Sequence, residues 1–256
     1  MAGDSMMNTA RMSISIIVPA FDEESNVAAA VQTVHAAASR WFDDVEIIVV
    51  NDGSSDRTGA VIDELALRLS GVRAVHHASP SGLGGAFRTG LQLASMNCVM
   101  RANGCNDMTE SSLDVIFGAA DATGIVVPFT VNTRERSALR RVISRVFTLI
   151  MNALFGFRLR YFNHSVLMPT HLARDADDGS SSYAFQAAML VRLLDRGTPF
   201  VEVGVEDRFD PRKRTKAFRW ANVVGVSRDL ARLYVRERLC RRLRGDGVWG
   251  ASRLAT

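Results

Sequence analysis

The stretch SIIVPAFDEES, residues 15–25, places an apolar β-branched run directly before a proline and an acidic loop. The same pattern returns at 46–58, where EIIVVNDGSSDRT ends in an acidic turn. Helix-like segments separate these runs, and further apolar runs follow at 72–77, 97–101, 124–131 and 200–205. Strands that alternate with helices of about 10–15 residues predict βαβ units. We therefore expect an α/β fold whose central sheet is mostly parallel, with helices on both faces.

Length and composition fit one globular domain. The chain has 256 residues, of which 47% are hydrophobic and 23% charged, so a disordered protein is excluded. The longest uncharged apolar stretch, 146–157, is far shorter than the roughly 20 residues that cross a bilayer, and the run 12–21 has no signal-peptide cleavage site. The three cysteines form no CxxC pair, which argues against a disulfide scaffold and a structural zinc. The expected location is the cytoplasm.

Positive charge is concentrated near the C-terminus. Residues 208–244 hold 13 lysines and arginines and three acids, whereas the rest of the chain holds 18 basic and 24 acidic residues. Arg228, Arg232 and Arg236 recur at a spacing of four, which predicts a cationic stripe along one helix. We expect an anionic partner such as a phosphate group or a membrane surface, with a solvated helix face as the alternative. Nucleic acid is not an expected partner, because no aromatic residues alternate with the basic ones.

Four polar loops follow predicted strands, at 19–24, 51–56, 79–85 and 101–110. Ligands of open parallel sheets bind beyond the carboxyl ends of the strands, where such loops meet. The acidic turn 51–56 can accept hydrogen bonds from a base or a ribose, although the same residue types also form ordinary capped turns. The glycine turn 81–85 begins a predicted helix, so its N–H groups can face an anion. Each of these loops is a weak signal by itself.

The combination of motifs is more specific. SIIVPAFDEES, EIIVVNDGSSDRT and SGLGGAFRTGL (81–91), at these intervals, resemble family 2 glycosyltransferases of the GT-A fold. SYAFQAAMLVRLL (182–194) and VEVGVEDRF (201–209), followed by KRTK, resemble the dolichol- or polyprenyl-phosphate mannose synthase branch in order and spacing. The resemblance implies a Rossmann-like GT-A domain at 12–215, between a flexible N-terminus at 1–11 and a basic helical extension at 216–256.

The resemblance also implies roles for individual residues. The nucleotide would lie against Pro19, Ala20, Phe21, Glu23, Asp52, Gly82, Gly84 and Asn103. Asp52 would contact the base, Asp56 would shape its turn, and the two glycines would leave room for the nucleotide. Arg208 and Lys216 would hold phosphates of the donor or the acceptor; with Arg101, which departs from the family pattern as described next, they are the candidate catalytic cations. Gln186 would lie near the sugar.

The metal motif of the family is altered in this chain. The family has D-x-D followed two positions later by a polar ligand, whereas Arg101, Asn103 and Cys105 occupy these positions here. Mg²⁺ and Mn²⁺ require oxygen ligands, and an arginine has no acceptor. We therefore expect no metal cofactor, and we expect the Arg101 guanidinium to neutralise the donor diphosphate instead. A shifted Mg²⁺ or Mn²⁺ site at Asp107 and Glu110 is the alternative, although these residues also fit a helix N-terminus.

The acceptor side departs further from the family. Ala188 stands where the branch has the acid of F-Q-x-E, and YFNHSVL at 161–167 replaces a segment that contains an acid and an arginine. His164 is a candidate general base for a hydroxyl acceptor. A phosphate acceptor needs no base, because it is already ionised. We expect a polyprenyl phosphate or another anionic acceptor, with a soluble small molecule of specialised metabolism as the alternative.

The expected function is transfer of a sugar from a UDP- or GDP-type nucleotide sugar, with inversion and without a metal. Direct displacement needs a cradle for the diphosphate, an aligned acceptor and a cation near the departing oxygen. The alternative is a catalytically degenerate protein of the same fold that binds a nucleotide sugar as a sensor or partner subunit. A nucleotidyltransferase fits less well, since such enzymes have a glycine-rich basic loop after the first strand, where this chain is acidic.

Overall fold

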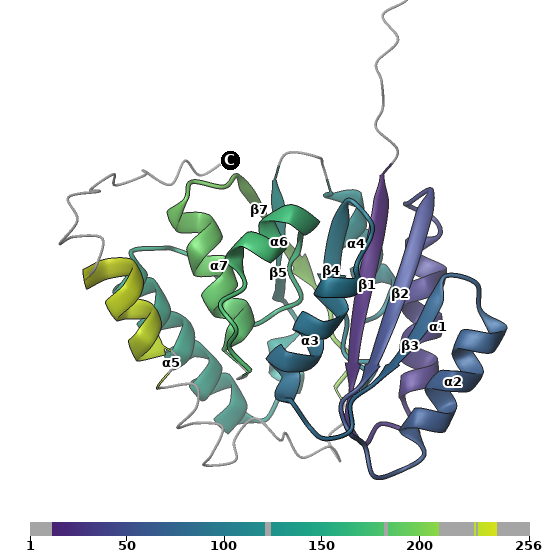
Figure 1. Ribbon diagram of the computed structural model, residues 1–256. Coiled ribbons are helices and arrows are strands. Elements are labelled where there is room, and N and C mark those ends of the chain that lie inside the picture. Colours follow the sequence, from purple (N-terminus) through teal and green to yellow (C-terminus); the bar gives the residue numbers. More distant parts are fainter. Residues whose placement is uncertain (1–11, 121–123, 182–183, 210–227, 229, 240–256) are drawn as a thin grey trace, which may run out of the picture.

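The computed structural model describes residues 12–120, 124–181, 184–209, 228 and 230–239. Seven strands form one sheet in the order β3-β2-β1-β4-β6-β5-β7, and helices cover both of its faces (Figure 1). β6 is antiparallel to its two neighbours, whereas all other neighbouring strands are parallel. The predicted α/β fold with a mostly parallel sheet is confirmed.

The first half of the chain forms four parallel strands and the helices that connect them. Its elements are β1 (Ser13–Ala20), α1 (Val27–Ala38), β2 (Asp44–Asn51), α2 (Thr58–Arg68), β3 (Val72–His76), α3 (Gly82–Leu93), β4 (Cys98–Arg101) and α4 (Glu110–Gly118). Each element predicted for this half is present, with ends shifted by a few residues.

The second half contains three elements that the sequence does not predict. Its elements are β5 (Ile125–Thr130), the 3-10 turn η1 (Thr133–Glu135), α5 (Ala138–Phe155), β6 (Leu167–Pro169), α6 (Thr170–Ala176), α7 (Phe185–Asp195) and β7 (Phe200–Val205). The unpredicted ones are η1, β6 and α6, because three, three and seven residues are too few to show a hydrophobic period. β6 pairs with both β4 and β5, and it thereby joins the two parallel parts of the sheet.

Alternate side chains of the strands fill two cores, one on each face of the sheet. Ile16 and Val18 of β1 pack on the face covered by α1, α2 and α4. Ile17 and Ile48 pack on the opposite face, against α3, α6 and α7. The strands are apolar on both faces because both faces are covered. Gly90 lets α3 approach β1 closely, since a Cβ atom there would lie 2.4 Å from Cγ2 of Ile17.

Residues 230–239 form a helix that lies beside α5 (Figure 1), and its last part, η3 (Val235–Leu239), has π-helical geometry. Leu233 is buried in the core that contains α5 and α7, and the ring of Tyr234 packs on that of Phe155 with centroids 6.3 Å apart. The rest of the extension predicted at 216–256 and the N-terminus at 1–11 lie outside the described residues. The predicted domain boundaries therefore stay predictions.

The outer face of α5 is apolar. Its exposed large side chains, which we call the α5 stripe, are Leu139, Val142, Ile143, Val146, Leu149, Ile150 and Leu154. Their spacing of three and four residues places them along one side of the helix, and Met151 and Phe155 are its only buried residues. A surface helix of a globular protein normally turns its apolar side inward. Among the described residues, no helix has the length and apolar character needed to cross a membrane.

Candidate functional site

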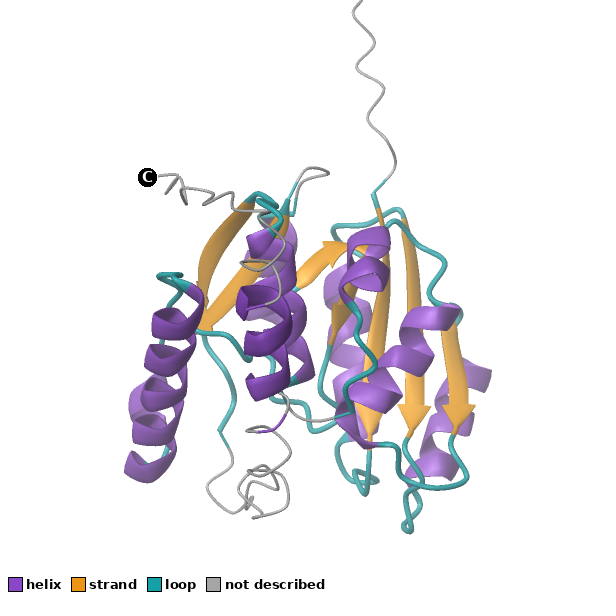
Figure 2. Ribbon diagram, turned by 60° about the vertical axis from the view of Figure 1, so that its left-hand side comes forward, coloured by secondary structure: helices purple, strands orange, loops and turns teal. Residues whose placement is uncertain are grey.

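The carboxyl ends of β1, β2, β3 and β4 meet at one edge of the sheet, because these strands are parallel (Figure 2). β2 and β3 lie on one side of β1, and β4 lies on the other. Loops that leave neighbouring strands in opposite directions at such a point open the crevice in which α/β proteins bind their ligands. The structure thus brings the four predicted loops to one place.

The acidic loops after β1 and β2 are hydrogen-bonded to each other. The carboxylate of Asp22 accepts from the N–H of Ser55 at 2.9 Å, and the carboxylate of Asp56 accepts from the N–H of Glu24 at 3.2 Å. Asp56 also accepts from the N–H and the hydroxyl of Thr58, the residue at which α2 begins. These carboxylates therefore join the two loops into one wall of the site.

Two residues predicted in the nucleotide-binding loop lie inside the sheet. Pro19 and Ala20 end β1 and are buried, and the carbonyl of Pro19 accepts from the N–H of Gly104 at 3.3 Å. Phe21 is the first exposed side chain of the loop. The carboxylate of Glu23 accepts from the side-chain amide of Asn26 at 2.8 Å, next to the start of α1.

Asp52 holds the start of α3. One carboxylate oxygen accepts from the N–H and the hydroxyl of Ser81 at 2.7 and 2.8 Å and lies 2.8 Å from Nδ1 of His77. The other oxygen accepts from the N–H of Gly82 at 2.9 Å. Burial acts to raise the pKa of Asp52, but the hydrogen bonds from Ser81, His77 and Gly82 outweigh burial and lower the pKa below its ordinary value. Asp52 is therefore a carboxylate at neutral pH. The base of a nucleotide would have to bind oxygens that already accept hydrogen bonds from Ser81 and Gly82, and this contact with the nucleotide base stays a prediction.

The predicted glycine turn faces another part of the chain. A Cβ atom at Gly82 would lie 2.8 Å from the carbonyl oxygen of Ser181, and one at Gly84 would lie 2.3 Å from that of Ser180. Gly82 also has a φ angle of +82°, which favours glycine. In this structure the two glycines therefore leave room for the backbone of residues 180–181.

Arg101 is a buried cation at the end of β4, with 5% of its surface exposed. Its Nε donates to Oε1 of Gln186 at 3.0 Å and its NH1 donates to Oδ1 of Asn103, whereas NH2 has no partner among the described residues. The amide of Asn103 donates in turn to Asp107 at 2.7 Å. Burial lowers the pKa of Arg101, and the charge of Asp107 opposes this shift; arginine stays protonated nevertheless. The structure thus brings together three predicted site residues from β4, its loop and α7.

The residues at the altered D-x-D position do not fit a divalent metal. Arg101 offers only donors, and the oxygen of Asn103 is taken by Arg101. Glu110, part of the alternative metal site, forms an ion pair with Arg40 at 3.1 Å on the surface, and it begins α4 directly after the N-cap Thr109. Within the described ranges, no three His, Cys, Asp or Glu side chains lie together in a way that could hold a metal ion.

Asp207, which follows β7, is the centre of a second buried cluster. One carboxylate oxygen accepts from the hydroxyl of Thr130 at 2.6 Å and from NH2 of Arg136 at 2.8 Å, and the other lies 3.1 Å from Nε2 of His164. The N–H of Ser165 donates to Nδ1 of His164 at 2.8 Å, so the neutral ring has its proton on Nε2. Both ring nitrogens are therefore engaged, and the role of His164 as a general base stays a prediction that requires one of these bonds to break.

Burial acts to raise the pKa of Asp207, but the hydrogen bond and charge of His164, the Thr130 hydroxyl and the Arg136 charge together lower the pKa below its ordinary value. The guanidinium of Arg136 also lies 4.8 Å from the ring centroid of Phe209. These contacts fix Arg136 at the carboxyl end of β5.

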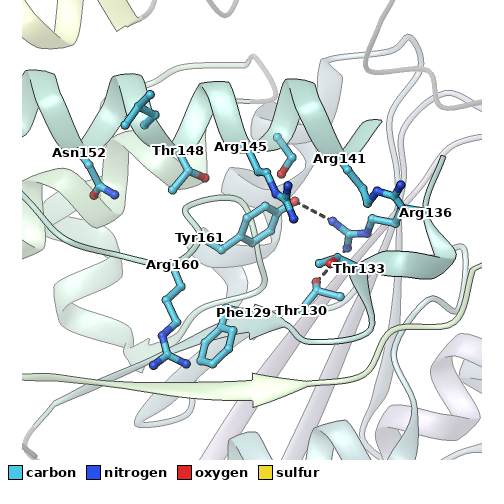
Figure 3. A pocket seen from close by; sticks show the side chains of 12 residues that line it. Phe129, Thr130, Thr133, Arg136, Arg141, Arg145, Thr148, Asn152, Arg160 and Tyr161 are labelled. Carbon is cyan, nitrogen blue, oxygen red and sulfur yellow. Dashed lines mark hydrogen bonds between the residues drawn. The ribbon is translucent and has the colours of Figure 1, made fainter. Parts of the chain in front are cut away.

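A groove rich in arginine extends from this cluster along the inner side of α5 (Figure 3). We call it the arginine groove after its four cations, Arg136, Arg141, Arg145 and Arg160. Its volume is about 420 Å³, and none of the described residues that line it is acidic. Figure 3 shows Arg141 and Arg145 of α5 and Tyr161 pointing into the same space. Nε of Arg136 is buried and has no hydrogen-bond partner in the described part of the chain.

The remaining predicted cations are Arg208 and Lys216. Arg208 is exposed, its NH1 donates to Oδ1 of Asn106 at 3.0 Å, and its backbone N–H donates to the carbonyl of Asp107 at 2.7 Å. Arg208 is therefore attached to the loop that follows β4. Lys216 lies outside the described residues.

Sequence comparison gives the family. Residues 15–177, more than half of the chain, match the profile of glycosyl transferase family 2. The chain is a family 2 glycosyltransferase. Polyprenol monophosphomannose synthase of Mycolicibacterium smegmatis is 32% identical to it over 206 residues, which cover 74% of this chain and 75% of that protein. A dolichyl-phosphate beta-glucosyltransferase of Trichomonas vaginalis is 37% identical over 82 residues, 30% of this chain and 25% of that one.

Solved structures agree with this family at the level of the fold. Glucosyl-3-phosphoglycerate synthase from Mycobacterium tuberculosis, in complex with UDP, superimposes with a TM-score of 0.66 at 18% identity, covering 89% of this glycosyltransferase and 80% of that chain. Its complex with Mn²⁺, UDP-glucose and phosphoglyceric acid gives the same TM-score. The predicted family and its GT-A fold are confirmed.

Sequence reasoning missed the partners of the predicted residues. Asp207 stands beside Arg208 in the sequence, but only its burial reveals a charge cluster. Arg136 lies in a stretch without strand or helix periodicity, and it pairs with Asp207 across 71 positions. The sequence did contain a signal for a cationic site at 134–145, where five arginines occur without a compensating number of acids.

Proposed function

We propose that this glycosyltransferase moves a sugar from a nucleotide-diphosphate donor to a phosphate-bearing acceptor, by direct displacement with inversion and without a divalent metal. The observation that carries the proposal is the position of Arg101. It is a buried cation at the carboxyl end of β4, next to the point where the strand order reverses, and it stands where the family has its metal motif.

Arg101 supplies the charge that a departing diphosphate needs. When the bond from the sugar to the diphosphate breaks, negative charge grows on the leaving oxygen. Gln186 and Asn103 hold Nε and NH1 of Arg101, which fixes the plane of the guanidinium and leaves NH2 for the ligand. A cation that is held in place before the reaction stabilises this charge without rearrangement. Its N–H groups donate to phosphate oxygens with charge-assisted bonds.

The arginine groove fits the acceptor phosphate. Four guanidinium groups line it, and none of the described residues that line it is acidic. Arg136 is paired with Asp207 through NH2, but its Nε has no hydrogen-bond partner among the described residues. A phosphate in the groove would be ionised at neutral pH and could attack the sugar carbon without a general base. His164, whose two nitrogens are engaged, then has the task of holding Asp207 and, through it, Arg136.

We place this acceptor at a lipid surface. Leu149 of the α5 stripe is 69% exposed and also lines the arginine groove, so the anionic site and the apolar surface are continuous. Arg140 and Arg145 flank the stripe, and long arginine side chains reach phosphate headgroups while their stems stay apolar. An apolar side edged by cations is typical of helices that lie in a membrane interface. A polyprenyl phosphate fits both surfaces better than a soluble small molecule.

Turnover tests the proposed reaction. The full chain is incubated in EDTA with UDP- or GDP-sugars and a polyprenyl phosphate, and the glycosylated lipid is measured. We expect transfer from one donor series, at a rate that added Mg²⁺ or Mn²⁺ does not change. Transfer that requires a metal contradicts metal independence. Donor binding without transfer to any phosphate acceptor supports the degenerate nucleotide-sugar-binding alternative.

Two arginines of α5 provide a matched test of the groove. Arg145 lines the arginine groove, whereas Arg140 lies outside it on the same helix. Arg145→Gln should raise the KM for the acceptor phosphate about tenfold or more, because a lost charge-assisted hydrogen bond is worth about 1.5–3 kcal/mol, and it should leave the KM for the donor unchanged. Arg140→Gln is the control. Equal effects of the two variants would place the acceptor elsewhere.

Vesicle binding tests the membrane partner. We expect the chain to sediment with vesicles that contain anionic lipid and to release them at high salt, because Arg228, Arg232 and Arg236 are exposed on the neighbouring helix. Leu149→Asp should reduce this binding strongly. Leu67→Asp, on α2, is the control, since Leu67 is 89% exposed and lies outside the α5 stripe. Equal binding of both variants, or of neutral and anionic vesicles, would contradict the membrane surface.

A further inference from the structure

Residues 177–181, which we call the strap, lie directly on the glycine turn at the start of α3. The N–H of Gly84 donates to the carbonyl of Ser181 at 3.3 Å. The carbonyl oxygen of Ser180 is so close that a Cβ atom at position 84 would lie only 2.3 Å from it. The N–H of Gly82 is already taken by Asp52. Two of the amides at this helix start are therefore occupied by the chain itself.

Two arginines attach the strap to the helices on either side. Arg88 of α3 binds both of its ends, through Nε to the carboxylate of Asp177 at 2.8 Å and through NH2 to the carbonyl of Ser180 at 2.8 Å. Arg192 of α7 donates to the carboxylate of Asp178 and to the carbonyl of Ala176. Arg88 thus reaches a side chain and a backbone carbonyl of the strap, and Arg192 reaches one strap side chain and the carbonyl of Ala176, which ends α6 directly before the strap.

Arg192 also connects the strap to the C-terminal helix. It is 5% exposed, and its Nε lies 3.4 Å from a carboxylate oxygen of Glu237, which is itself buried. Burial acts to raise the pKa of Asp178, and the hydrogen bond from Arg192 with further backbone bonds lowers the pKa below its ordinary value. The buried Arg192 is thus paired with carboxylates from the strap and from residues 230–239.

We propose that the strap covers the donor turn and must leave it before a nucleoside diphosphate binds there, with Arg88 and Arg192 as the positioning residues that hold the covered state. The proposal rests on the donor site described above. The carbonyl oxygens of Ser180 and Ser181 point at the start of α3, where they would lie beside the diphosphate and repel it. A ligand that needs the uncovered state binds with its intrinsic affinity multiplied by the fraction of uncovered molecules.

A variant that loosens the strap should therefore bind the donor more tightly. Asp177→Asn weakens the pair with Arg88, and we expect its dissociation constant for UDP or GDP, whichever the wild type binds, to fall about two- to tenfold. Asp175→Asn is the control, because Asp175 is an exposed acid of the same region that makes no such pair with another described residue. A merely structural role of Asp177 could weaken binding or stability but could not tighten binding. An unchanged or higher dissociation constant overturns the proposal.

Hydrogen exchange of the wild-type chain gives a second, independent result. Saturating UDP or GDP should increase amide exchange in the peptide that contains 177–181 and decrease it in the peptide that contains 51–56. Slower exchange in both peptides would show that the strap closes over the ligand, which overturns the proposal while the donor site stands. A wild-type chain that binds neither nucleotide contradicts the proposed function itself, and the strap proposal with it.

Discussion

Replacement of Arg101 by glutamine should separate recognition of the diphosphate from recognition of the nucleoside. Glutamine removes the positive charge but keeps an amide that can still reach Gln186 or Asn103, so the change to the fold is small. NH2 of Arg101 has no partner among the described residues, and one charge-assisted hydrogen bond to a phosphate oxygen is worth about 1.5–3 kcal/mol. Loss of one such bond raises the dissociation constant about 10- to 150-fold.

The assay is isothermal titration calorimetry in EDTA, with the nucleoside, the monophosphate and the diphosphate of the preferred base. We expect Arg101→Gln to raise the dissociation constant of the diphosphate by this factor of about 10 to 150 and that of the nucleoside by less than about twofold. Arg68→Gln, an exposed arginine on α2, is the control for a general charge effect. The reasoning is refuted if Arg101→Gln binds the diphosphate as the wild type does, or if EDTA abolishes binding by the wild type.

Three further variants test other parts of the site and the fold. Asp52→Ala should weaken binding of the nucleotide about tenfold or more, because the start of α3 loses the carboxylate that accepts hydrogen bonds from its N–H groups. An unchanged dissociation constant, measured by calorimetry, argues against a nucleotide there. Asp207→Asn should destabilise the fold by about 3 kcal/mol at pH 7, because it leaves Arg136 without its buried partner. Because the pKa of Asp207 is lowered in the folded state, its contribution to the free energy of unfolding is complete above the unfolded pKa of about 4 and is lost as the pH falls through the lower folded value. The difference in Tm between wild type and variant should therefore shrink in acid, and a constant difference would contradict this. Gly90→Ala should cost about 1–3 kcal/mol in chemical unfolding, because its Cβ atom would lie 2.4 Å from a methyl carbon of Ile17.

Much of the first half of the chain could be predicted from the sequence, because its signals are local. The run at 46–50 shows by its Ile and Val content that it is a buried strand, and the glycines at 82–85 mark the start of α3. Where signals are short or weak, prediction failed. β6 has three residues and pairs antiparallel with β4 and β5, a contact that no local pattern encodes.

In the candidate site, too, residues in local motifs could be predicted and contacts between distant residues could not. Arg101 and Asn103 were found because they replace acids in a recognisable motif, and Gln186 was found from a second motif. That Gln186 contacts Arg101 follows only from the packing of α7 on the sheet, since the two residues are 85 positions apart. The engagement of Asp52 with Ser81 and of His164 with Asp207 likewise joins distant loops.

The sequence by itself determined the family, the alternation of strands and helices, and the loss of the metal motif, because each depends on residue type and spacing along the chain. The tertiary structure alone decided which charges are buried together, which amides are already occupied, and which side of α5 faces outward. These depend on contacts between distant segments and on the loss of water around them. The apolar pattern of α5 is the same whether its stripe faces the core or the solvent, so only the placement of the helix could reveal the exposed stripe and the arginine groove behind it.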